Sequence, residues 1–155
     1  MALGTPAATT AETIAAIEQV RRLARRANAA MDGELEELGL TSAQFFFLEA
    51  VAAAPREHIA EIARETRTSR QAADRLARQL VRGDLIELMP LDLGVRGLNL
   101  TDVGHRRIRL AREAVASVLA PIDDVLDERE RTALARSAER AAVALRPRPR
   151  PWWFG

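Results

Sequence analysis

Apolar residues recur at helical spacing along the first part of the chain. From Ile14 to Met31 they fall at steps of three to seven residues, while arginines occupy the other face. This periodicity predicts an amphipathic helix that starts near Thr10. Residues 1–9 are small, polar and interrupted by proline, so we expect a disordered arm there. Gly33 and Gly39 bracket an acidic stretch that either continues this helix or closes it.

A second helix is predicted to start at residues 41–42, with Thr41 or Ser42 as its N-cap. Three consecutive phenylalanines, residues 45–47, make it apolar on nearly all sides, so it should be central to the core. They cannot all point inward: we expect Phe45 in the core. Pro55 should end this helix, and a short helix should follow over about residues 56–64.

The next segment predicts a helix-turn-helix motif. Thr68 and Gln71 have the spacing of a capping box, and a helix should run over about residues 69–82. Its buried side should consist of Ala72, Ala73, Leu76, Leu80 and Val81. Its exposed side should consist of Arg70, Gln71, Asp74, Arg75 and Arg78. Two helices joined by a short turn, the second with an exposed polar face, are typical of this motif.

After Asp84 the hydrophobic period changes from that of a helix to that of a strand. Residues 85–89 and 97–100 read as paired strands, with residues 90–96 as the turn. A hairpin directly after a helix-turn-helix predicts a winged helix. A helix over about residues 102–119, broken by Pro121, and a last helix over about residues 128–145 should follow.

Composition narrows the possible functions. The chain has no cysteine, which excludes disulfides, thiolate nucleophiles and cysteine-bound zinc. No apolar stretch approaches the roughly 18 residues of a membrane span, and no signal peptide is evident, so we expect a cytoplasmic protein with no membrane partner. We find no catalytic triad, phosphate-binding glycine loop or metal-ligand spacing. We therefore expect neither an enzyme nor a cofactor or metal site, and His58 and His105 should be surface or capping residues.

The order and spacing of several short motifs resemble the multiple-antibiotic-resistance regulator (MarR) family. The motifs are Leu40-Thr41-x-x-Gln44-Phe45, Ile59-Ala60-x-Ile62-Ala63, Ser69 to Leu76, Asp84 to Glu87 and Leu100-Thr101-x-x-Gly104. With the flanking helices, the resemblance covers about residues 10–146. It implies a mainly α fold with a small β-hairpin wing, in which a winged helix-turn-helix lobe (about residues 40–101) lies between dimerisation helices (about residues 10–38 and 102–146).

The resemblance also implies a homodimer that binds double-stranded DNA at a pseudo-palindromic operator. Such proteins are often repressors that a small anionic or phenolic effector releases. The wing departs from the family pattern, in which an aspartate near the tip often pairs with an arginine two positions later. Here Arg96 takes the position of the arginine, but Gly94 takes that of the aspartate. The returning strand is also about two residues shorter than is common. These departures, with a net charge of only +1, leave open a winged-helix module that binds a protein instead of DNA.

Candidate site residues follow from this interpretation. Arginine pairs with guanine and glutamine with adenine, and a helix N-terminus binds phosphate. The predicted DNA contacts are Thr68, Ser69, Arg70, Gln71, Arg75, Arg78 and Arg96. The predicted effector contacts are Phe46, Phe47, Met31 and Arg25, with core packing and a solvated helix face as their alternatives. The tail of residues 147–155, rich in arginine, proline and tryptophan, binds DNA, a membrane surface or a partner subunit, or is disordered.

Overall fold

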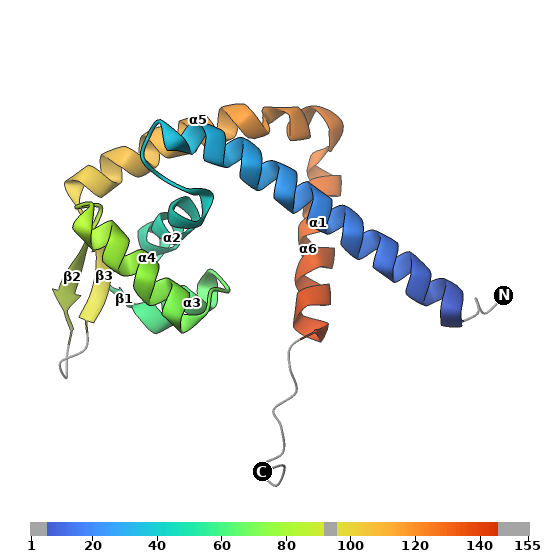
Figure 1. Cartoon of the computed structure of the whole chain (residues 1–155), viewed down its shortest axis with the longest axis horizontal. Helices are drawn as coiled ribbons and strands as arrows, with labels where there is room; N and C mark the ends of the chain where they lie inside the picture. Colours follow the sequence, from blue (N-terminus) through green and yellow to red (C-terminus); the bar gives the residue numbers. More distant parts are fainter. Residues whose placement is uncertain (1–5, 92–95, 146–155) are drawn as a thin grey trace, which may run out of the picture. The chain divides into compact units, whose positions relative to one another are not determined.

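The computed structural model of this chain describes residues 6–91 and 96–145. In chain order its elements are α1 (Pro6–Glu36), α2 (Ser42–Ala53), β1 (Glu57–His58), α3 (Ile59–Glu65), α4 (Arg70–Arg82), β2 (Ile86–Pro90), β3 (Arg96–Leu100), α5 (Asp102–Val125) and α6 (Glu128–Ala144) (Figure 1). The expected fold class, mainly α with a small β-hairpin wing, is confirmed. Within the described ranges, no helix is long and apolar enough to cross a membrane.

The chain divides into two compact units. One is Arg25–Leu119, and the other combines Met1–Ala24 with Ala120–Gly155. In the second unit, several large apolar side chains of α1 and α6 are exposed, and no residue of α6 is buried. The buried core therefore belongs to the Arg25–Leu119 unit.

The start of α1 differs from the sequence prediction. The helix begins at Pro6, so residues 6–9, which we expected in a disordered arm, are helical. Proline is suited to the first turn of a helix because its missing N–H has no partner there, and the alanines that follow are good helix formers. At its other end, α1 continues through Gly33. It closes before Gly39, whose positive φ of 66° is a conformation that glycine adopts at low cost.

Helix α2 is the centre of the core. Thr41 is its N-cap and forms a capping box with Gln44, which settles the choice between Thr41 and Ser42. Phe45 and Phe47 are both buried, whereas the side chain of Phe46 is 49% exposed. The prediction for Phe45 is confirmed.

The segment after Pro55 contains a strand that the sequence did not predict. Residues 57–58 form β1, and α3 starts only at Ile59. β1 pairs with β3 in an antiparallel sheet of order β1-β3-β2, with Glu57 opposite Leu98 and His58 opposite Gly97. A Cβ atom on Gly97 would overlap the backbone carbonyl of Arg56, so glycine is what allows the two strands to approach.

The predicted hairpin is confirmed. β2 and β3 pair in register from Ile86 opposite Leu100 to Pro90 opposite Arg96. Figure 1 shows α3 and α4 beside this sheet, with the hairpin following directly on α4. The predicted turn residues 92–95, including Gly94, lie outside the described residues, as does the 147–155 tail.

Helix α5 does not end where the sequence suggested. We expected Pro121 to break it near Leu119, but α5 runs to Val125 with Pro121 inside. A proline removes one backbone hydrogen bond of the helix, and helix-forming residues on either side can tolerate that loss. The start of α5 is capped by Thr101, whose hydroxyl accepts the Gly104 N–H at 2.9 Å. The final helix, α6, is capped by Asp127.

Candidate nucleic-acid interface

Helix α4 carries most of the predicted DNA contacts. Its N-cap is Ser69, whose hydroxyl accepts the Ala72 N–H at 3.2 Å. The expected capping box between Thr68 and Gln71 is therefore wrong by one residue: the Thr68 hydroxyl instead donates to the Thr66 carbonyl. The cause lies in the turn, where Arg67 has a positive φ of 52° and the Thr68 amide is bound by Ala63.

This tight turn fixes how α4 leaves α3. The Thr66 hydroxyl donates to the Ile62 carbonyl at 2.8 Å, which closes the last turn of α3. Because the backbone groups of the turn are bound in this way, α4 emerges in one defined direction. Hydrogen bonds of residues 66–69 therefore fix the direction of α4 relative to α3.

One face of α4 packs against the core and the other is exposed. The buried residues are Ala73, Ala77 and Leu80, whereas Val81, which we expected to be buried, is 37% exposed. Ala72 and Leu76, also expected to be buried, are half-buried. The exposed face carries Arg70, Gln71, Arg75 and Arg78, as predicted, and also Arg82. Asp74, which we expected on this face, is half-buried.

Four of these residues form a single stripe along the helix. Gln71, Arg75, Arg78 and Arg82 are separated by four, three and four positions, the spacing that places residues on one side of a helix. The sequence interpretation included the first three and missed Arg82. Its spacing of four from Arg78 was the signal that could have found it.

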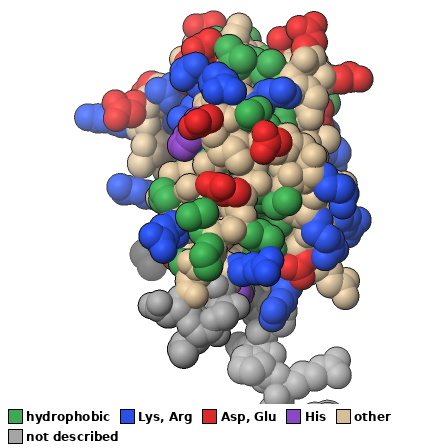
Figure 2. Space-filling view, turned by 90° about the vertical axis from the view of Figure 1, so that its left-hand side faces the viewer, with side chains coloured by type: hydrophobic (Ala, Val, Ile, Leu, Met, Phe, Trp, Pro, Cys, Tyr) green, Lys and Arg blue, Asp and Glu red, His purple; other side chains and the backbone are tan. Residues whose placement is uncertain are grey.

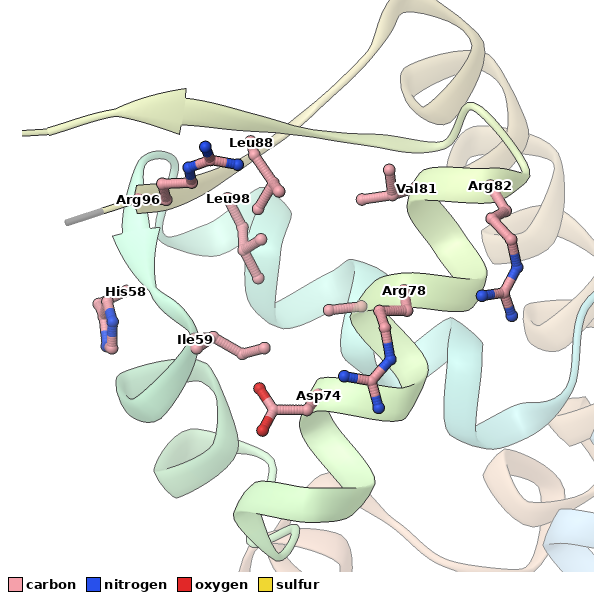
Figure 3. Close-up of a pocket in the computed structure, with 10 residues that line it drawn as sticks. His58, Ile59, Asp74, Arg78, Val81, Arg82, Leu88, Arg96 and Leu98 are labelled. Carbon is pink, nitrogen blue, oxygen red and sulfur yellow. The ribbon is translucent and has the colours of Figure 1, made fainter. Parts of the chain in front are cut away.

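Between α4 and the hairpin the molecule has a hollow of about 390 Å³. Figure 3 shows that α4 contributes Asp74, Arg78 and Arg82 to it, whereas Arg96 comes from β3 and His58 from β1. Apolar side chains also line it, namely Ile59, Ala77, Val81, Leu88 and Leu98. The structure thus brings two predicted DNA contacts, Arg78 and Arg96, to one hollow.

The arginines of this region are not used to hold the fold together. Among the described residues, no hydrogen bond or ion pair is found for the side chains of Arg70, Arg75, Arg78, Arg82 or Arg96. Elsewhere, by contrast, Arg64 pairs with Glu61. Figure 2, seen from the side of the hairpin, shows basic side chains gathered along one edge and hydrophobic ones near the middle. The guanidinium groups of the five arginines named above are therefore available for an anionic partner.

A bidentate ion pair links α5 to α2. Arg112 donates to both carboxylate oxygens of Glu49, at 2.7 and 3.0 Å. This hydrogen bonding raises the pKa of Arg112 above its usual value. The Asp32 carboxylate accepts the Ser42 N–H at 2.5 Å, and Arg107 donates to the Leu38 carbonyl. These contacts attach α2 and the turn before it to α1 and α5.

The residues predicted to contact an effector do not share one surface. Met31 and Phe47 are packed in the core and are 3% and 1% exposed. Phe46 lines a separate hollow with Glu49 and Thr66, and Arg25 is exposed on α1. A ligand would reach Met31 and Phe47 only if the core opened, so an effector site at these residues stays a prediction.

The two histidines were expected to be surface or capping residues. His58 is the N-cap of α3: its Nδ1 accepts the Ala60 N–H at 3.2 Å. His105 is exposed on α5. Sequence reasoning did not anticipate that His58 would line the hollow, because that position depends on β1.

Comparison with known proteins shows which family this chain resembles. A model of the MarR family matches residues 38–91, while no curated protein matches the chain. A solved MarR family transcription regulator, SP03579, is 23% identical, with a TM-score of 0.73 over 91% of this chain and 98% of that chain.

Two further solved structures agree with this. The M. tuberculosis transcriptional regulator MosR is 24% identical, with a TM-score of 0.71 over 83% of this chain and 96% of that chain. A mutant MarR from E. coli, complexed with operator DNA, is 19% identical, with a TM-score of 0.74 over 84% of this chain and 95% of that chain. The resemblance seen in the sequence is confirmed: residues 38–91 match a model of the MarR family, and the chain has the fold of solved MarR family regulators.

Proposed function

We propose that this protein is a sequence-specific DNA-binding transcriptional regulator that acts without enzymatic chemistry. The observation that carries the proposal is the exposed stripe on α4, where Arg75, Arg78 and Arg82 have no partner among the described residues. A helix of about 10–12 Å diameter fits the major groove of B-DNA. An unpaired basic face on the second helix of a helix-turn-helix is suited to that groove.

The contacts divide by chemistry. Arg70, Gln71 and Arg75 lie in the first part of α4 and are exposed, so they would reach base edges. Ser69 and Thr68 precede the helix and would contact phosphate together with its first backbone amides. Arg78 and Arg96 would contact the sugar-phosphate backbone or the adjacent minor groove.

Proteins with this fold support the proposal. MepR from S. aureus, MosR from M. tuberculosis and MarR from E. coli have each been solved with DNA. At 18–24% identity these likenesses show the fold, so the DNA contacts of this chain rest on its own α4 and β3.

The active form would be a homodimer. Ile14, Ile17, Val20 and Leu23 are exposed on α1, and Leu134 and Val143 are exposed on α6. Large exposed apolar side chains are typical of an interface. A second copy with two-fold symmetry would cover them and present two α4 helices to half-sites about one helical turn apart. The operator should then be pseudo-palindromic.

Regulation of DNA binding would act through the distance between the two winged helix-turn-helix lobes of the dimer. We expect repression in the cytoplasm and release by a small anionic or phenolic effector that changes this spacing. The M. tuberculosis MarR family protein Rv2887 has been solved with salicylic acid, which is such a molecule. Because Met31 and Phe47 are buried here, their part in an effector site requires a test of its own.

Fluorescence anisotropy tests the proposal. The protein is titrated into the duplex that flanks its own gene and into a scrambled duplex of equal composition, over a series of salt concentrations. We expect tight binding to the first duplex, weaker binding to the second and a steep loss of affinity with salt. Equal, weak binding to duplexes from every candidate promoter, together with capture of a protein partner by the winged helix, would replace this proposal with a protein-interaction module.

A further inference from the structure

We infer that α5 contains a hinge at Ala120 and Pro121, about which the last turn of α5 and the whole of α6 pivot as one body. The inference starts from the division of the chain into two compact units. The boundary between them cuts α5 between Leu119 and Ala120, and Pro121 follows directly inside the helix. Hinges consist of a few residues that absorb a change in backbone angles.

The backbone of α5 is weakened at this point. Pro121 has no N–H, so the Ser117 carbonyl, four positions earlier, lacks its donor within the helix. The proline ring also crowds that carbonyl, and sharp kinks of helices occur at prolines. Ala120 and Pro121 are both exposed. Neither the backbone nor side-chain packing therefore opposes bending at these two residues.

Before the hinge, α5 is held firmly to the core. Ala111 is fully buried and Val115 is 9% exposed, while Arg112 holds α2 through its bidentate pair with Glu49. Leu119, which is half-buried, still packs against the buried core of the Arg25–Leu119 unit. The first part of α5 would therefore move with that unit.

After the hinge, hydrogen bonds hold the corner between α5 and α6 together. Arg131 of α6 donates to the Leu126 carbonyl at 2.6 Å and pairs with the Asp123 carboxylate at 3.0 Å. Asp127 and Glu130 form a capping box, in which each side chain accepts the backbone N–H of the other. The last turn of α5 is thus attached to α6, and bending is confined to the hinge.

Helix α1 also crosses the boundary between the units, between Ala24 and Arg25. Residues 21–26 are all exposed, so little packing stiffens α1 at this point. A helix of 31 residues curves gently along its length, whereas a proline concentrates the bend. The motion is therefore localised in α5, and α1 would follow it.

The hinge has a consequence for DNA binding, and this consequence rests on the proposed function. In a dimer that forms through α1 and α6, pivoting at Pro121 would change the distance between the two winged helix-turn-helix lobes. One base pair changes the separation of two half-sites by about 3.4 Å. We therefore expect the protein to accept operators whose half-site spacings differ by one base pair.

Pulsed electron paramagnetic resonance tests the hinge without DNA. The chain has no cysteine, so Glu113→Cys in α5 and Arg136→Cys in α6 supply the two sites for spin labels, and excess unlabelled protein leaves one labelled chain per dimer. We expect a broad distribution of distances that narrows in Pro121→Ala, because alanine restores the N–H and is a good helix former. Ser117→Ala, which keeps the proline, is the matched control and should stay broad. Equal widths in Pro121→Ala and the wild type would overturn the hinge.

Fluorescence anisotropy then tests its use, on the operator, on duplexes with one base pair added or removed between the half-sites, and on a scrambled duplex. The wild type should bind the three operator spacings within about tenfold of one another. Pro121→Ala should bind the operator as well as the wild type does but lose about tenfold more on the altered spacings. Unchanged tolerance of spacing in this variant would overturn the role in DNA binding. Failure of the proposed function looks different: the wild type would not distinguish the operator from the scrambled duplex, while the distance measurement would stand.

Discussion

At the scale of single residues, the positions that define the wing are those where a side chain is missing or a backbone angle is unusual. Gly97 lets β3 approach Arg56, and Arg56 itself has a positive φ of 66°. The need for glycine at position 97 comes from a steric contact with a residue that is distant in the sequence. The sequence shows a glycine at position 97 but not the chain segment that lies against it, so β1 could not be predicted.

A matched pair of glycine substitutions tests this account. Gly97→Ala places a Cβ against the Arg56 backbone, which cannot move as a flexible side chain would. We expect a loss of about 1–3 kcal/mol in the free energy of unfolding, measured by urea denaturation. Gly33→Ala, in α1 with nothing within 4 Å of the added atom, should raise stability by about 0.5–1 kcal/mol. Equal effects of the two substitutions would show that Gly97 does not hold β1 in place.

At the scale of elements, periodicity predicted what depends on one segment at a time. The change of period after Asp84 identified the hairpin, and the alternation of apolar and basic residues identified the exposed face of α4. Periodicity failed where contact with another segment of the chain determines the environment of a residue. Val81 is exposed at the hollow between α4 and the hairpin. His58 lines the hollow only because a two-residue strand pairs with β3.

Thr101 joins two elements, which gives a prediction at this scale. Its hydroxyl accepts the Gly104 N–H at 2.9 Å and donates to the Asp84 carbonyl at 2.5 Å, so it caps α5 and holds the turn before β2. Thr101→Ala should destabilise the protein by about 0.5–2 kcal/mol in urea denaturation. Thr101→Ser retains the hydroxyl and should remain within about 0.5 kcal/mol of the wild type. If serine were as damaging as alanine, the methyl group and not the hydrogen bonds would be responsible.

At the scale of the whole molecule, the proposal requires a dimer. Ile17 is exposed on α1, and a charge there would be costly to bury in an interface. Ile17→Glu should therefore shift the protein toward monomer in sedimentation velocity at micromolar concentration and weaken operator binding. Gln19→Glu adds the same charge at an exposed position of α1 and serves as the control. A wild-type protein that sediments as a monomer, or an Ile17→Glu variant that stays dimeric, would contradict this surface as the interface.

The central claim is that α4 recognises DNA sequence, and substitution of Arg75 tests it most directly. Operator and scrambled-duplex affinities are measured for the wild type, Arg75→Ala and Arg109→Ala, the last removing an exposed arginine of α5. We expect Arg75→Ala to lose about 1–3 kcal/mol of operator binding and much of the preference over the scrambled duplex. Arg109→Ala should retain that preference. An operator preference that is unchanged in Arg75→Ala would contradict the assignment of Arg75 as a base contact.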